Sequence, residues 1–261
     1  MAFKEEIADL MSDGISCEFL APKNKCSFGL PQLDLLVGNG LPLSSITEVY
    51  GSAGSGKTQL CFQLASTILR NDDNANVLFI CTQERFPIDR LVSMLGSSER
   101  ALLDRVHIEY FLDSEVECHF FQYSLFEMMR EFNYKLIIFD SIASNSRNID
   151  NIFEKSEHIN GIIAAFKRVF LHFEVCVLIT NQITDIPSDT ELLKTSALGL
   201  TLENNVNLKI YLEKTNNVNE RKISVQKALY SAPSKGYFII STESLKGLVE
   251  DESRIENIND I

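Results

Sequence analysis

The chain has 261 residues, of which 45% are hydrophobic, and a formal net charge of −12. This size and composition allow one large α/β domain or two small ones, with a sizeable core, and argue against intrinsic disorder outside the ends. The acidic balance argues against strong unaided binding to nucleic acid, because proteins that grip a phosphate backbone usually carry a basic face.

Strand and helix patterns alternate along most of the chain. After a short helix at 3–11, we expect strands at 45–50, 77–81, 106–110, 135–139 and 175–180. Helical stripes fall at 57–70, 87–95, 121–132 and 152–173, and β-structure follows at 206–212, 222–227 and 236–241. This order predicts an α/β fold with a mostly parallel central sheet, helices on both faces and a C-terminal antiparallel β extension. No apolar run reaches the roughly 18 residues of a membrane span, so we expect a soluble intracellular protein.

The strongest motif lies between the first of these strands and its helix. It reads Gly51-Ser52-Ala53-Gly54-Ser55-Gly56-Lys57-Thr58, a complete G-x-x-x-x-G-K-[ST] pattern. Glycines let such a loop curl around phosphates, the lysine reaches the β- and γ-phosphates, and the threonine hydroxyl binds Mg²⁺. The motif predicts that ATP or a closely related nucleoside triphosphate binds here, with Gln59 as the next residue of the site.

Two later strands end in polar groups that could complete this site. Asp140 follows the strand at 135–139, where a carboxylate can hold Mg²⁺ through water; the alternative is an aspartate that caps the next helix. Asn181 and Gln182 follow the strand at 175–180, and an amide there can sense the γ-phosphate. An Asn-Gln pair in this position is also typical of a simple turn.

These residues resemble the ATPase core of the RecA/RadA-type strand-exchange recombinases. The resemblance rests on Phe28-Gly-Leu-Pro-Gln-Leu-Asp34, the segment from Gly40 through the phosphate loop, Gln59-Leu-Cys-Phe-Gln-Leu-Ala65, Asp140-Ser-Ile-Ala143 and Thr180-Asn-Gln-Ile-Thr-Asp185. It implies a RecA-like P-loop ATPase core at 28–248, preceded by a short segment at 1–27 and followed by an acidic tail at 249–261.

Within this family the chain looks most like a eukaryotic recombinase paralogue of the X-ray-repair cross-complementing kind. The supporting segments are 80–91, 105–109 and 196–201. The resemblance implies ATP and Mg²⁺ as cofactors and a role in homologous recombination and double-strand break repair. It also implies complexes with other paralogues and with the main recombinase on single-stranded DNA, and residence in the nucleus, with a cytoplasmic pool left open.

One departure from the family concerns catalysis. The family places a glutamate after the second core strand to polarise the attacking water, whereas this chain has Gln83 there, with Glu84 next. A glutamine can orient water but is a negligible base, so hydrolysis should be slow unless Glu84 substitutes. We expect an ATP-binding protein with weak or DNA-dependent ATPase activity.

Other departures concern assembly and DNA. The only F-x-x-A pattern lies at 62–65, inside a predicted core helix, so we expect no self-assembly through the family's F-x-x-A plug; the segment before the core could instead add to a partner's sheet. The two loops expected to face DNA, 141–157 and 183–202, are not basic, and we expect neither to offer an aromatic ring on which bases could stack. Single-stranded DNA should therefore bind weakly to the isolated chain.

Two other functions remain open at this point. The first alternative is an active DNA-dependent ATPase that forms its own recombinase filament. The second is a P-loop kinase or a non-recombination RecA-fold ATPase. No arginine-rich lid supports a kinase, while Arg221 and Lys222 on a late predicted strand bear a weak similarity to the arginine finger of a ring helicase.

Overall fold

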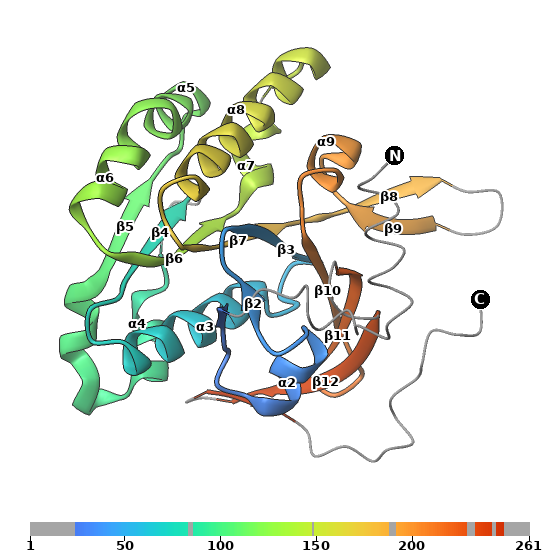
Figure 1. Ribbon diagram of the computed structural model, residues 1–261. Coiled ribbons are helices and arrows are strands. Elements are labelled where there is room, and N and C mark those ends of the chain that lie inside the picture. The colour runs from blue at the N-terminus through green and yellow to red at the C-terminus, as the bar shows by residue number, and fades with distance from the viewer. Residues whose placement is uncertain are drawn as a thin grey trace, which may run out of the picture.

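The computed structural model describes residues 24–82, 86–147, 149–187, 192–228, 233–241 and 244–247. The helix expected at 3–11 and the acidic tail lie outside these ranges. A sheet of nine strands organises the described part of the chain, in the spatial order β13-β12-β11-β10-β3-β7-β6-β4-β5 (Figure 1). A two-stranded sheet of β1 (Lys25–Cys26) and β2 (Leu41–Pro42) precedes it.

The six strands from β10 to β5 run parallel to one another. Helices cover both of their faces, which explains why most of them are nearly continuous apolar runs. Their carboxyl ends share one edge of the sheet, the edge at which open α/β sheets bind ligands. In sheet order from the edge they are β5 (Val106–Tyr110), β4 (Asn76–Cys81), β6 (Tyr134–Asp140), β7 (Cys176–Asn181), β3 (Ser45–Gly51) and β10 (Leu208–Lys214).

Side chains that alternate along these strands contribute to two separate hydrophobic cores. On β4, Val77 and Phe79 join one core, while Leu78 and Ile80 join the other. The first core lies under α2 (Pro31–Leu36), α3 (Lys57–Asn71), α4 (Ile88–Leu95) and the 3₁₀ segment Ser97–Arg105. The second lies under α5 (Ser114–His119), the π-helical turn Phe120–Ser124, α6 (Leu125–Glu131), α7 (Ile142–Ser146), α8 (Ile152–Phe170) and α9 (Gly199–Glu203). The two groups of helices lie on opposite sides of the sheet (Figure 1).

The C-terminal strands extend the sheet antiparallel, as the sequence predicts. They are β11 (Glu220–Ala228), β12 (Ser234–Ile240) and β13 (Leu245–Gly247). The fold is therefore the expected mostly parallel sheet with helices on both faces and an antiparallel end. Among the described residues, no helix combines the length and apolar character needed to cross a bilayer.

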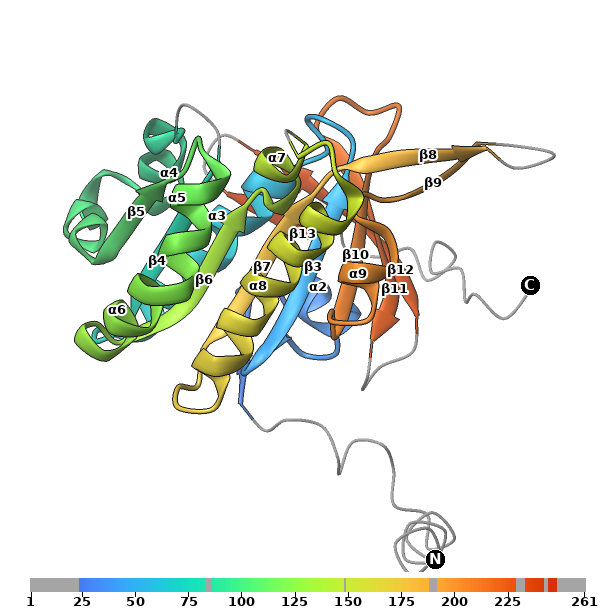
Figure 2. The same ribbon diagram turned by 90° about the horizontal axis from the view of Figure 1, so that it is seen from above.

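Three expectations about local structure were wrong. The loop expected at 141–157 contains the short helix α7. The helix that begins at Ile152 ends at Phe170 rather than Phe173, because the chain turns there to enter β7, with the N–H of Phe173 bonded to the Val169 carbonyl at 3.0 Å. The segment expected as a loop after Gln182 contains a hairpin of β8 (Ile183–Pro187) and β9 (Leu192–Ser196). This hairpin extends away from the body of the domain (Figure 2).

Candidate nucleotide-binding site

The predicted phosphate loop joins the end of β3 to the start of α3. Gly51 has no room for a side chain, because a Cβ atom there would lie 2.3 Å from the Leu212 carbonyl oxygen and 2.6 Å from Ser55 Oγ. Gly54 and Gly56 have φ of +71° and +102°, a backbone conformation that favours glycine. The loop therefore curls at the amino end of α3, where unpaired backbone N–H groups attract anions.

Lys57 lies across this loop. Its Nζ donates to the carbonyl oxygens of Gly51 at 2.8 Å and Ser52 at 3.0 Å. Burial lowers the pKa of the Lys57 ammonium, and the nearby Asp140 carboxylate opposes this shift. An anion bound at the loop would stabilise the charged form of Lys57 in the same way.

A cavity of about 730 Å³ opens beside the loop. Of the residues predicted to bind the nucleotide or Mg²⁺, Gly51, Ser52 and Ser55 shape the loop without lining the cavity, whereas the rest of the loop, Gln59, Asp140 and Gln182 line it. Several lining residues were not predicted as part of the site, because they come from distant elements. The described residues that line the cavity are Ala53, Gly54, Gly56, Lys57, Thr58, Gln59, Arg90, Asp140, Ser141, Gln182, Asn219, Arg221, Ile240 and Ser241.

Asp140 lies where a magnesium ligand is expected. The Thr58 hydroxyl donates to Asp140 Oδ2 at 2.8 Å, and the Thr180 hydroxyl donates to Asp140 Oδ1 at 2.6 Å. Hard oxygen donors next to a phosphate loop suit Mg²⁺, which is bound through one or two carboxylates together with substrate phosphates. The residues present thus fit the ion: Thr58 and Asp140 would hold it, and Thr180, which the sequence did not single out, orients the carboxylate.

Gln182 also lines the cavity. Its Oε1 accepts a hydrogen bond from the Arg147 guanidinium, and its backbone carbonyl accepts from the N–H of Ala197 at 2.8 Å. Gln182 therefore joins the cavity to α7 on one side and to the base of the β8–β9 hairpin on the other. This connection is the one that a sensor of the γ-phosphate would need.

Gln83 and Glu84 lie outside the described residues, and Thr82 is the last described residue before them. Thr82 Oγ1 donates to the Ser141 carbonyl and accepts from the Ser141 N–H, both at 2.9 Å. The Thr82 N–H donates to the Asp140 carbonyl at 3.1 Å. Thr82, the residue before Gln83, is thus held directly beside the carboxyl end of β6.

The family of the chain follows from comparison with known proteins. The profile of the Rad51 family matches residues 24–245. The chain belongs to the Rad51 family. It is 25% identical to the DNA repair protein XRCC3 of Bos taurus over 215 residues and 25% identical to XRCC3 of Mus musculus over 221 residues. It is 27% identical to the DNA repair and recombination protein RadA of Aeropyrum pernix over 203 residues.

Each of these alignments covers 73% of this chain and 63% of the relative. The chain thus spans less than two thirds of the length of the curated relatives it matches. The resemblance to strand-exchange recombinases and their paralogues is confirmed, and ATP, typically with Mg²⁺, is the nucleotide that Rad51-family ATPases use.

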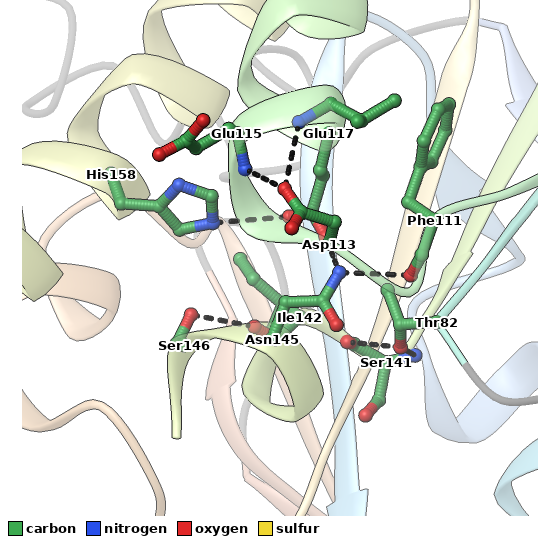
Figure 3. Close-up of polar contacts among 11 residues, drawn as sticks. Thr82, Phe111, Asp113, Glu115, Glu117, Ser141, Ile142, Asn145, Ser146 and His158 are labelled. Carbon is green, nitrogen blue, oxygen red and sulfur yellow. Dashed lines mark hydrogen bonds and ion pairs between the residues drawn. The ribbon is translucent and has the colours of Figure 1, made fainter. Parts of the chain in front are cut away.

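A buried polar cluster anchors the segment that follows Asp140 in this Rad51-family domain (Figure 3). Asn145 of α7 donates to the Phe111 carbonyl at 2.9 Å and to the Glu117 carboxylate. His158 Nε2, on α8, lies 3.1 Å from the other oxygen of Glu117, whose side chain is fully buried. The cluster therefore holds α7 and the first half of α8 against α5.

The expectation that the first of the segments facing DNA offers no aromatic ring was wrong, because Phe153 lies within 141–157. Phe153 is 84% exposed, and its neighbour Ile152 is 77% exposed. Both lie in the first turn of α8, which the Asn151 side chain caps by accepting from the Phe153 N–H at 2.9 Å. An exposed aromatic ring is a group on which a nucleic-acid base can stack.

A second buried network connects the phosphate-loop strand to the hairpin. Glu48 on β3 is fully buried and accepts from Asn181 Nδ2 at 2.7 Å, and the same amide donates to the Ala197 carbonyl at 2.7 Å. Lys209 Nζ lies 4.0 Å from the other Glu48 oxygen and also pairs with Glu203. Burial raises the pKa of Glu48, while the Asn181 hydrogen bond and the Lys209 charge oppose the shift.

This raised pKa makes the stability of the domain depend on pH. The folded state holds the Glu48 proton more tightly than the unfolded state, so stability from this group is present at low pH and declines as pH rises through the folded pKa. Replacing Glu48 by glutamine keeps an acceptor for Asn181 and removes the buried charge. We expect E48Q to raise the melting temperature at pH 8 by roughly 2–4 °C, with a smaller gain at pH 5.

Thermal unfolding of wild type, E48Q and the exposed-site control E157Q at both pH values checks this expectation. E157Q should melt with the wild type throughout. A lower melting temperature for E48Q at pH 8 would show that the Lys209 ion pair outweighs the cost of burying the carboxylate.

Proposed function

We propose that this chain is an ATP-binding recombinase paralogue that assists homologous recombination and DNA double-strand break repair. It acts in complexes with other paralogues and the main strand-exchange recombinase on single-stranded DNA, and resides in the nucleus. The observation that carries the proposal is the joining of a complete phosphate loop to Asp140 at the ligand-binding edge of a Rad51-family sheet. The DNA-repair names of the relatives support the same role.

In this proposal ATP acts mainly as a structural ligand and switch. The loop amides and Lys57 hold the phosphates, and Thr58 with Asp140 holds the Mg²⁺ ion, which neutralises phosphate charge when bound. Gln182 reports the γ-phosphate to Arg147 and to the neck of the hairpin. Gln83 orients water without removing its proton, so turnover is slow unless Glu84 acts as the base.

The sheet also offers a place for a partner. Among the described strands, β5 pairs with β4 alone and ends the sheet, which leaves its outer edge open to strand addition. Large apolar side chains are exposed at the carboxyl end of this strand and on α5: Tyr110 (47%), Leu112 (62%) and Val116 (57%). An extended segment of another Rad51-family protein could pair with β5 and cover them.

Single-stranded DNA would meet the side that carries α7, the start of α8 and the hairpin. Phe153 supplies a stacking surface there, and Arg147 supplies a positive charge. Asp150 and Glu154 lie in the same segment, so phosphate neutralisation is weak. DNA binding by the isolated chain is therefore weak and strengthens in a complex.

ATP turnover with and without single-stranded DNA tests this function. We expect the wild type to bind ATP and to hydrolyse it very slowly, with little stimulation by DNA. Replacing Gln83 by glutamate restores the general base and should raise turnover by about 100-fold, while the exposed-site control Q122E should change nothing.

Brisk DNA-stimulated turnover by the wild type would contradict the proposal. It would favour the alternative function, a DNA-dependent ATPase that forms its own filament, with Glu84 as the working base. Capture of a tagged chain from cells, with and without V116E, tests the partner assignment. Rad51-family proteins should co-purify with the wild type and be lost with V116E, and their absence from both would contradict it.

A further inference from the structure

One wall of the cavity, next to the phosphate loop, comes from the C-terminal strands. Lys214 on β10 pairs in register with Arg221 on β11, which pairs with Phe238 on β12. Residues directly opposite each other on antiparallel strands project from the same face of the sheet. Lys214, Arg221 and Phe238 therefore share one face.

This face packs directly on the phosphate loop. A Cβ atom at Gly56 would lie 3.6 Å from Arg221 Cγ and 3.6 Å from the Phe238 ring. A Cβ atom at Gly54 would lie 3.1 Å from Lys214 Nζ. Arg221 thus lies against the end of the loop that enters α3, and Lys214 against the middle of the loop. The two side chains come from positions 214 and 221, far in sequence from the loop they contact.

The guanidinium of Arg221 is only partly satisfied. Its Nη1 donates to the carbonyl oxygens of Val218 at 2.8 Å and Glu220 at 2.7 Å. Its Nε is buried and has no hydrogen-bond partner within the described residues. No ion pair of the described part of the chain involves Arg221 or Lys214. A buried cationic donor without a partner is costly, and a bound anion would remove that cost.

The charges around the cavity are also uneven. Lys57, Arg90 and Arg221 line it, with Lys214 beside the loop, whereas Asp140 is the one carboxylate among the described lining residues. This concentration of positive charge occurs in a chain of net charge −12. A cluster of like charge around a concave site attracts and retains an oppositely charged ligand.

We propose that Arg221, supported by Lys214, is a phosphate-binding residue of the nucleotide site. The inference rests on the proposed ATP binding and extends it: the late strands of the chain supply their own cations to the polyphosphate, in addition to Lys57. The ligand class is a nucleoside di- or triphosphate. A nucleoside monophosphate has too little charge to gain much from the added cations, because the attraction scales with the charge of the ligand.

Fluorescent ATP, ADP and AMP analogues, titrated into wild type, R221Q, R221K and K222Q, test the proposal. Lys222 is the matched control, since it is the adjacent cation on the same strand. It lies opposite Glu213 of β10 and Tyr237 of β12 in the sheet register, and it is absent from the described cavity lining. We expect R221Q to weaken ATP and ADP binding about tenfold and AMP binding about threefold or less. R221K should fall between R221Q and the wild type, and K222Q should match the wild type.

Equal losses for all three nucleotides would assign Arg221 a structural role and overturn the inference, as would ATP binding by R221Q at wild-type strength. Either result leaves the proposed function intact as long as the wild type binds ATP. Failure of the wild type to bind ATP would instead overturn the proposed function itself. Thermal unfolding of each variant shows whether a loss of binding reflects a loss of fold. If R221Q does not fold, the nucleotide affinities of R221K, which keeps the charge and most of the aliphatic stem, test the proposal instead.

Discussion

Replacing Lys57 by alanine is expected to lower the affinity for ATP by about 100-fold. Lys57 is the cation of the phosphate loop, and its Nζ donates to the Gly51 and Ser52 carbonyls. In K57A these carbonyls lose their donor, and the phosphates lose their nearest charged hydrogen-bond partner. Titration of a fluorescent ATP analogue measures the loss.

The fold should survive this substitution. Burial lowers the pKa of Lys57, so the charged amine is a cost to the folded state at neutral pH, and its removal should leave the melting temperature nearly unchanged. The exposed-site control K246A should bind ATP as the wild type does. ATP binding by K57A at wild-type strength, with an intact fold, would mean that the cavity does not bind nucleotide through the loop.

Replacing Gly51 by alanine is expected to have the largest effect on stability. The added Cβ would lie 2.3 Å from the Leu212 carbonyl oxygen, a backbone atom of β10 that is fixed by the parallel pairing of β3 with β10. The second contact, 2.6 Å to Ser55 Oγ, lies within the loop itself. Because neither contact is with a long flexible side chain, we expect G51A to lower the free energy of unfolding by about 3 kcal/mol and to abolish ATP binding. Urea denaturation measures the first effect.

Gly161 provides the matched control for this substitution. It lies inside α8, and a Cβ atom there would meet nothing within 4 Å. Alanine in the middle of a helix is more favourable than glycine by roughly 0.5–1 kcal/mol, so G161A should stabilise the domain. The two glycine-to-alanine changes therefore have opposite expected signs. A G51A protein as stable as the wild type would show that the loop and β10 can separate without cost.

The sequence by itself determined the elements whose signals are local. A strand, a glycine-rich turn and a helix are consecutive in the chain, so the phosphate loop could be predicted directly, and in the structure it joins β3 to α3. Asp140 could be singled out because it ends a mostly apolar strand. Parallel strands end at a common edge, which placed Asp140 beside Thr58, as the 2.8 Å hydrogen bond shows. The family resemblance rests on the same local, ordered motifs.

Tertiary structure alone decided which distant residues complete the site. Thr180 orients Asp140 because β7 lies next to β6, and Arg221 and Ile240 reach the cavity because the antiparallel end of the sheet folds beside the loop. The hairpin after Gln182 escaped prediction because its strands are short and one ends in a proline. Glu48 lies in a run that predicts only a buried strand, and its hydrogen bond to Asn181 requires β3 and β7 to be adjacent. Local patterns specify which segments become strands and helices, whereas contacts between segments far apart in sequence depend on the order in which the strands pack.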